Sequence, residues 1–182
     1  MAITGDAEWK GGDYHPGDGP GTGLALARMI GHITYLSEES MDRKFGRRFL
    51  EETGRAGCGG GGFQVEGYLH SQGSKFVRRF DANTYLTLTR AMDRFDLAAE
   101  YGSLEGAFSR CRSSFLVVSF TSDWLFTPSQ SREMVAAMKR TGLNVSYCNL
   151  KSDQGHDAFL LSGNRLGEVV KGYLNRLMEE LP

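Results

Sequence analysis

The fold of this chain is decided by a run of apolar residues in its second half, Ser114-Phe115-Leu116-Val117-Val118-Ser119-Phe120. The run is continuous and rich in β-branched side chains, which is the pattern of a strand buried on both faces. Parallel sheets are built from strands of this kind. We therefore expect a parallel α/β arrangement around this run.

The residues that follow complete a β-α-β-α unit. Thr127 and Pro128 can cap and open a helix that ends at Gly142, and a second strand is expected from Asn144 to Leu150. The length of this connection suits a right-handed parallel crossover. A terminal helix then carries one apolar stripe, which consists of Leu166, Val169, Val170, Tyr173, Leu174 and Leu177.

Two strands alone leave uncovered edges, and a parallel pair needs neighbours for its backbone groups and its apolar faces. We therefore expect residues 112–182 to be the C-terminal part of a larger sheet. The other half of that sheet is then missing from this chain or comes from another chain.

The residues upstream of this unit predict helices. Residues 1–21 are rich in proline and glycine and predict an irregular surface lead-in. Residues 22–111 carry apolar side chains at helical spacing, with Ser37 and either Asp81 or Asn83 as helix caps. A loop is expected at 53–62, because each glycine of its tract costs about 1 kcal/mol relative to alanine in a helix.

The composition excludes several classes of partner. The chain has 182 residues, of which 40% are hydrophobic and 24% charged, as in an ordinary globular domain. Its 22 acidic and 21 basic residues are balanced and scattered, so we expect no nucleic acid partner. No apolar run reaches the length of a membrane span, and the start of the chain does not have the pattern of a signal peptide. We therefore expect a cytoplasmic protein.

The cysteines and histidines do not indicate a metal site. Cys58, Cys111 and Cys148 are widely spaced without a Cys-x-x-Cys pair, so reduced thiols are expected. No pair of His or Cys residues has ligand spacing together with a third partner. We expect no metal and no bound cofactor.

An acid and an imidazole follow the two predicted strands. In open α/β sheets, reactive groups lie on loops beyond the carboxyl ends of strands. Asp123 follows the first strand and His156 the second, which is the order of the last two triad members in α/β-hydrolases. In such a triad the carboxylate accepts the imidazole Nδ1–H, and Nε2 takes the proton of the nucleophile. From position alone, a helix-capping Asp123 and a hydrogen-bonded loop His156 are equally good interpretations.

The strings around these two residues resemble the homoserine O-acetyltransferase family. One runs from Ser119 to Phe126, and the other, after Tyr147-Cys148, runs from Gly155 to Leu161. The similarity extends upstream to residues 23–37, 63–66, 80–83 and 88–91, so that nearly the whole chain is covered. The resemblance implies an α/β-hydrolase core with a helical lid inserted between strands. Residues 22–111 would be that lid, and residues 112–182 the last two parallel strands and their helices.

The resemblance also implies an activity and site residues. Acetyl would pass from acetyl-CoA, as co-substrate, through an acyl-serine to the hydroxyl of L-homoserine, in methionine biosynthesis. Asp123 is similar to the triad acid, His156 to the general base and Asp157 to the residue that meets the substrate ammonium. Arg28 and Tyr35 are similar to tunnel residues that reach the nucleophile and the substrate. Lid helices of the family contribute to dimer contacts, which implies a homodimer.

The residues themselves leave other roles open for three of these positions. Arg28 and Tyr35 lie on one helix face and could form an interface or a snorkelling pair. Asp157 could be a charge that favours the start of a following helix.

The sequence departs from the family at the nucleophile. No serine in the chain lies in a Gly-x-Ser-x-Gly segment. The nearest case, Ser74, follows a glycine but has no strand before it. The oxyanion-hole segment is absent as well. Because triad members act as a unit, we expect that this chain alone does not turn over.

Two other functions stay open. Homoserine O-succinyltransferase shares the fold, and the choice of donor depends on pocket residues near the nucleophile. A non-catalytic helical association module is the second alternative, because exposed apolar sheet edges favour association.

Overall fold

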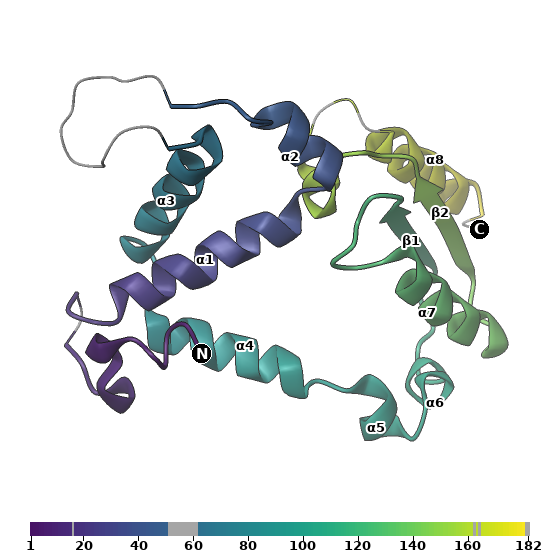
Figure 1. Cartoon of the computed structure of the whole chain (residues 1–182). Coiled ribbons are helices and arrows are strands. Elements are labelled where there is room, and N and C mark those ends of the chain that lie inside the picture. Colours follow the sequence, from purple (N-terminus) through teal and green to yellow (C-terminus); the bar gives the residue numbers. More distant parts are fainter. Residues whose placement is uncertain (16, 51–61, 162, 164, 181–182) are drawn as a thin grey trace. The chain divides into compact units, whose positions relative to one another are not determined.

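The chain forms two compact units in the computed structural model (Figure 1). The structure describes residues 1–15, 17–50, 62–161, 163 and 165–180. The first unit holds Met1–Thr34 and Met41–Phe95, and the second holds Tyr35–Ser40 and Asp96–Pro182.

A parallel pair of strands lies in the second unit. Strand β1 (Phe115–Phe120) pairs in register with β2 (Val145–Leu150), from Phe115 opposite Val145 to Phe120 opposite Leu150. Helix α7 (Pro128–Arg140) connects the two strands (Figure 1). The predicted order of strand, crossover helix and second strand is therefore confirmed.

Alternation along β1 places a helix on each face of this sheet. Val117 packs against the cluster that contains Met138 of α7. Val118 and Phe120 belong to a second cluster, which includes residues of helix α8 (Leu166–Glu179). Because successive side chains of a strand point to opposite faces, α7 and α8 cover opposite sides of the pair. This explains why the four residues at 115–118 are all apolar.

Helix α7 begins where its sequence predicts. The Thr127 hydroxyl accepts the N–H of Gln130, and the Gln130 side chain accepts the Thr127 N–H at 2.9 Å. Pro128 occupies the first turn, and Gly142 with a φ of 78° follows the end of the helix. An N-cap contributes about 1 kcal/mol to helix stability, so this end of the Asp123 loop is fixed.

Short helices complete the second unit. They are α5 (Leu97–Tyr101), α6 (Leu104–Phe108) and the 3-10 helix η2 (His156–Leu160). Phe108 at the end of α6 is buried together with Ala137 of α7. The middle of η2 is anchored by Ala158, which is buried in a cluster with Phe120 and Leu150.

The described part of the first unit is helical. Its elements are η1 (Ala7–Gly12), α1 (Gly21–Tyr35), α2 (Glu38–Lys44), α3 (Gln64–Val77) and α4 (Ala82–Arg94). The last residue of α1 and the first three of α2 belong to the second unit.

Two predicted helix caps are present. The Ser37 hydroxyl accepts the N–H of Ser40 at 3.0 Å, before the start of α2. The Asp81 carboxylate accepts the N–H of Thr84 at 2.7 Å and caps α4. Of the two residues considered for this second cap, Asp81 is therefore the correct one, and Asn83 lies inside the helix.

The first 21 residues are mostly exposed or half-buried, but they also contribute to the core of the first unit, which a surface lead-in does not imply. Ile3 is only 3% exposed and lies in a core cluster with Leu24. The Asp6 carboxylate accepts the N–H of Gly23 at 2.7 Å. A Cβ at Gly23 would lie 2.4 Å from the Ala2 carbonyl oxygen, so the segment lies directly on α1. The few apolar residues of this segment lie among glycines, prolines and charged residues and form no periodic pattern, so the sequence did not predict this contact.

The glycine-rich loop predicted at 53–62 lies outside the described residues, apart from Gly62. Its flanks are joined by an antiparallel bridge between Phe49 and Phe63. The Leu50 N–H donates to the Gly62 carbonyl at 2.9 Å.

Candidate active site

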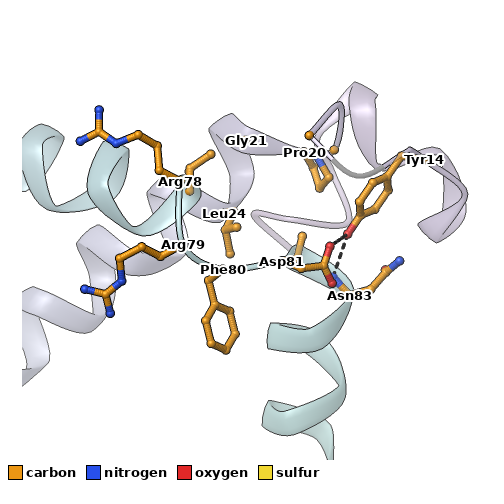
Figure 2. Close-up of a pocket in the computed structure, with 13 residues that line it drawn as sticks. Tyr14, Pro20, Gly21, Leu24, Arg78, Arg79, Phe80, Asp81 and Asn83 are labelled. Carbon is orange, nitrogen blue, oxygen red and sulfur yellow. Dashed lines mark hydrogen bonds between the residues drawn. The ribbon is translucent and has the colours of Figure 1, made fainter.

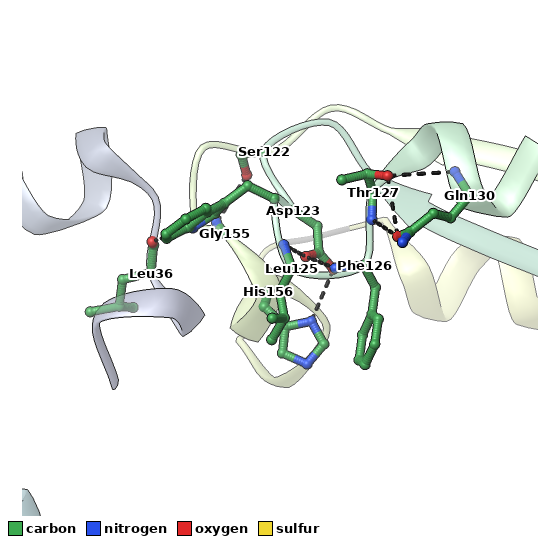
Figure 3. Close-up of polar contacts among 10 residues, drawn as sticks. Leu36, Ser122, Asp123, Leu125, Phe126, Thr127, Gln130, Gly155 and His156 are labelled. Carbon is green, nitrogen blue, oxygen red and sulfur yellow. Dashed lines mark hydrogen bonds and ion pairs between the residues drawn. The ribbon is translucent and has the colours of Figure 1, made fainter. Parts of the chain in front are cut away.

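The two loops that leave the carboxyl ends of β1 and β2 bring an acid and an imidazole into contact. Oδ2 of Asp123 lies 2.9 Å from Nδ1 of His156 (Figure 3). Asp123 is 8% exposed and the His156 side chain 20%. A carboxylate only accepts hydrogen bonds, so the imidazole donates through Nδ1 and leaves Nε2 able to accept a proton.

Backbone groups orient the carboxylate of Asp123. Its Oδ1 accepts the N–H of Leu125 at 3.0 Å and the N–H of Phe126 at 2.9 Å. The Asp123 N–H donates to the carbonyl of Phe120, the last residue of β1. One carboxylate oxygen is thus held by the loop, and the other is directed at the imidazole (Figure 3).

The His156 loop is held by its own set of bonds. The Gly155 N–H donates to the Ser122 hydroxyl at 2.9 Å. Thr121 Oγ1 donates to the Ser152 carbonyl at 2.9 Å and lies 3.0 Å from the Ser152 nitrogen. The residues that precede the acid and the base are therefore linked to each other, which fixes the two loops relative to each other.

Three aromatic rings surround the imidazole. The ring centroid of His156 lies 5.0 Å from that of Phe126, 5.9 Å from Phe159 and 5.8 Å from Tyr35. Phe126 is 64% exposed and Phe159 46%. The base is therefore bounded by apolar surface that remains open to a ligand or to another polypeptide segment.

A small cavity of about 250 Å³ lies beside the pair. Residues of β1, of the Asp123 loop, of α7 and of η2 line it, among them Ser119, Asp123, Ser131 and His156. Below it, the Ser119 hydroxyl lies 2.7 Å from the Tyr147 hydroxyl and donates to Asn149 at 3.0 Å. These bonds join the two strands through Ser119, which is itself buried and lines the cavity.

The structure places the other predicted site residues in different surroundings. Tyr35 belongs to the second unit and lies beside His156. Asp157 is half-buried and follows His156 in η2. Arg28 belongs to the first unit, where its guanidinium carbon lies 4.9 Å from the ring centroid of Phe76.

Several residues at this site were not found from the sequence. Ser122 and Trp124 flank the acid, and Ser37 lies far away in the chain, yet each makes a hydrogen bond that organises the loops. The one signal in the sequence is the glycine before His156, because glycine marks backbone conformations that other residues rarely adopt. In the structure Gly155 has a φ of 76° and a ψ of −151°.

The first unit contains a larger cavity of about 640 Å³ (Figure 2). The Tyr14 hydroxyl donates to Asp81 at 2.7 Å and accepts the N–H of Asn83 at 2.9 Å. The guanidinium groups of Arg78 and Arg79 point away from this pair in Figure 2. None of the predicted site residues lines this cavity.

Two pKa values are shifted at this cavity. The N–H of Thr84 and the Tyr14 hydroxyl lower the pKa of Asp81. Burial, followed by the bond to Asp81, raises the pKa of Tyr14. Both shifts belong to the cap of α4, which indicates a structural role.

Neither a metal nor a membrane is indicated in the described part of the chain. No group of three or more His, Cys, Asp or Glu residues there could hold a metal ion. No described helix is long and apolar enough to cross a membrane.

Individual relatives match this chain over nearly its whole length, although no protein-family model does. The homoserine O-acetyltransferase of Gluconobacter oxydans is 51% identical, over 96% of this chain and 46% of the relative. That of Methanococcus vannielii is 46% identical, over 98% of this chain and 36% of the relative. The chain is homologous to homoserine O-acetyltransferases. The resemblance predicted from the sequence is therefore confirmed.

Some relatives are named for succinyl transfer instead of acetyl transfer, and the relatives are longer than this chain. The homoserine O-succinyltransferase of Nitrosomonas eutropha is 49% identical, over 97% of this chain and 47% of the relative. The chain thus spans less than half the length of the homoserine O-acyltransferases it matches.

Solved structures confirm the fold class. A homoserine O-acetyltransferase from Bacillus anthracis has a TM-score of 0.74 and 24% identity, over 86% of this chain and 42% of that structure. An acetylester hydrolase from Corynebacterium glutamicum has a TM-score of 0.68 and 16% identity, over 98% of this chain and 47% of that structure. The fold is that of α/β-hydrolases, as predicted.

Proposed function

We propose that this chain supplies the acid and the general base of a homoserine O-acyltransferase. The nucleophile would come from a segment that is not in this sequence. The observation that carries this proposal is the contact between Asp123 and His156, with Oδ1 of the acid held by two backbone N–H groups. Such an arrangement leaves Nε2 of the imidazole available to a hydroxyl.

The chemistry then follows two matched proton transfers. His156 Nε2 takes the proton of a serine hydroxyl while the serine oxygen attacks the thioester carbonyl of acetyl-CoA. The C–S bond breaks, and the imidazolium returns the proton to the CoA sulfur. In the second half, His156 takes the proton of the homoserine hydroxyl, whose oxygen attacks the acyl-serine. The serine leaves with that proton, and O-acetylhomoserine is released.

Asp123 has two functions in this scheme. It fixes the imidazole tautomer and stabilises the imidazolium in each half-reaction. Without a nucleophile neither half can begin, so we propose that the chain alone does not transfer acetyl groups.

The acceptor is an amino acid, and the predicted binding residues match its charges. Asp157, one residue after the base, would bind the ammonium group, because an anion pairs with a cation. Arg28 would bind the carboxylate group of the substrate, and Tyr35 would line the substrate tunnel beside His156. A role in methionine biosynthesis, and with it a place in the cytoplasm, follows from the same activity.

The donor is proposed as acetyl-CoA. Succinyl-CoA is the second candidate, because a relative named for succinyl transfer is 49% identical and one named for acetyl transfer is 51% identical. Competition between the two thioesters in one assay would rank them.

A homodimer through lid helices is supported by the surface of α1. Leu26, Ile30 and Ile33 are 47%, 52% and 44% exposed and recur at helical spacing. Sedimentation velocity should show a dimer, and Ile30→Glu should shift it toward monomer. A monomeric wild-type protein would contradict this part of the proposal.

The activity is tested by restoring a nucleophile. We would join this chain to the part of the Gluconobacter oxydans relative that lies outside the match, and refer to the product as the joined protein. It should transfer acetyl from acetyl-CoA to L-homoserine, and His156→Ala should lower kcat by at least about 100-fold. Retention of activity within about tenfold in His156→Ala, or a folded but inactive joined protein, would overturn the assignment.

A further inference from the structure

We propose that Trp124 and Ser37 are positioning residues that hold the ring of Tyr35 against the His156 imidazole. They do so by fastening the segment Tyr35–Ser40 to both loops of the site. The inference rests on the proposed function only in its claim that His156 acts as a base. Its structural part concerns the described chain alone.

The first hydrogen bond that holds the segment Tyr35–Ser40 comes from the loop after β1, which carries Asp123. Trp124 follows Asp123, and its indole N–H donates to the Leu36 carbonyl at 3.1 Å. Figure 3 shows Leu36 beside the loops that carry the acid and the base. The Trp124 side chain is 57% exposed, so apolar burial is not its main contribution.

The second hydrogen bond joins the same segment to the loop after β2, which carries His156. The Ser37 hydroxyl donates to the carbonyl of Asp153, three residues before His156. Ser37 is 4% exposed, and its oxygen also accepts the N–H of Ser40. A buried hydroxyl that both donates and accepts a hydrogen bond is costly to remove, because the Asp153 carbonyl and the Ser40 N–H would each lose a partner.

A close backbone approach adds a third constraint. A Cβ on Gly155 would lie 2.5 Å from the Ser37 nitrogen and 2.7 Å from the Tyr35 carbonyl oxygen. The segment therefore rests directly on the residue that precedes His156. Because Trp124 and Gly155 adjoin the acid and the base, the same two loops set the position of Tyr35.

As a consequence, the Tyr35 ring has a fixed position beside the imidazole of His156. Asp123 fixes the plane of the ring through Nδ1, and the Tyr35 ring lies 5.8 Å from it at an interplanar angle of 41°. Small displacements of a base lower the rate of proton transfer much more than they weaken substrate binding. The fastened segment should therefore contribute to kcat.

The structural part is tested on the isotope-labelled chain by nuclear Overhauser contacts of the His156 ring. Trp124→Phe and Ser37→Ala should each weaken the contact to Tyr35, and the double variant should lose it. The contact to Phe126 should persist, because Asp123 holds the Phe126 N–H. Ser37→Thr, which keeps the hydroxyl, should restore the Tyr35 contact.

Two matched controls separate positioning from general damage. Trp9→Phe makes the same exchange in the first unit, and Ser103→Ala removes the cap of α6 without a fastening role. Both should leave the His156 contacts unchanged. A Tyr35 contact at full strength in the double variant would overturn the proposal, as would simultaneous loss of the Phe126 contact.

The functional part is measured separately in the joined protein. Trp124→Phe should lower kcat about tenfold and leave the KM for homoserine within about twofold. A change confined to KM would refute positioning of the base. If the unmodified joined protein is inactive, the proposed function fails, whereas the ring contacts still decide the structural part.

Discussion

The carboxylate of Asp123 and the imidazole of His156 lie 2.9 Å apart, across the carboxyl ends of two parallel strands. The acid is more deeply buried than the base, and its second oxygen is occupied by backbone N–H groups. The pair is therefore preorganised, since neither group has to move before the imidazole can accept a proton.

Replacing Asp123 by asparagine should keep the hydrogen bonds that hold its loop but remove the negative charge beside the imidazole. The amide oxygen can still accept the N–H groups of Leu125 and Phe126, but the amide nitrogen would favour the wrong imidazole tautomer. In the joined protein, kcat should fall by about 10³–10⁴-fold with little change in thermal stability. The measurement is acetyl transfer at saturating substrates, and a loss below about tenfold would exclude Asp123 as the triad acid.

Asp157→Ala should act on acceptor binding. If the carboxylate meets the substrate ammonium, the KM for L-homoserine should rise more than kcat falls. Steady-state kinetics of the joined protein with homoserine as the varied substrate check this. Asp153→Ala, on the same loop, is the control for loss of a carboxylate near the base. An unchanged KM in Asp157→Ala would remove Asp157 from the binding site.

Gly155→Ala should destabilise the chain strongly. A side chain there must adopt a backbone conformation that is almost restricted to glycine and must also displace the backbone of Ser37. We expect a loss of at least about 3 kcal/mol in the free energy of unfolding. Gly142→Ala is the matched control, because that glycine also has a positive φ but no atoms lie within 4 Å of the added Cβ. It should cost about 1–2 kcal/mol.

Urea unfolding of both glycine variants gives the comparison. Equal losses at Gly155 and Gly142 would show that the close approach to Ser37 does not constrain the folded chain.

Asp81 should make stability depend on pH in the acidic range. Its pKa is lowered in the folded chain, first by the N–H of Thr84 and then by the Tyr14 hydroxyl. The contribution to stability is therefore present above the unfolded pKa of about 3.9 and is lost as the pH falls through the lower folded value. Asp81→Asn keeps a capping group but no titrating one.

The comparison is the free energy of unfolding of the two proteins between neutral pH and the acid limit. The advantage of the wild type over Asp81→Asn should be constant above the unfolded pKa and should disappear at lower pH. An advantage that grows as the pH falls would have the opposite sign and would contradict the assignment.

The sequence predicted the parts of the fold that local patterns determine. The largely apolar run at 114–120 predicted β1, and Thr127 with Pro128 predicted the start of α7, because strand burial and helix capping depend on neighbouring residues. Chain order and the rule for strand ends made Asp123 and His156 candidates for a pair, and the resemblance to the homoserine O-acetyltransferase family was needed to favour the pair over a capping aspartate and a loop histidine.

Contacts between distant segments were not predictable in this way. The bond from Trp124 to Leu36 joins residues 88 positions apart, and no periodicity marks it. Helical spacing placed Arg28 and Tyr35 on one face of a helix. It could not predict that Arg28 lies over Phe76 and Tyr35 beside His156, because spacing defines a face but not the neighbour that the face meets.

The division of the chain has a practical consequence for anyone who dissects this protein. The polypeptide enters the second unit at Tyr35, leaves it after Ser40 and returns at Asp96. A single cut therefore cannot separate the two units as they fold. A piece expressed from Asp96 onward would retain the acid and the base, but it would lack residues 35–40, of which Tyr35, Leu36 and Ser37 lie against Gly155. Any such piece must carry residues 35–40 through a linker or a circular permutation if its base loop is to keep its shape.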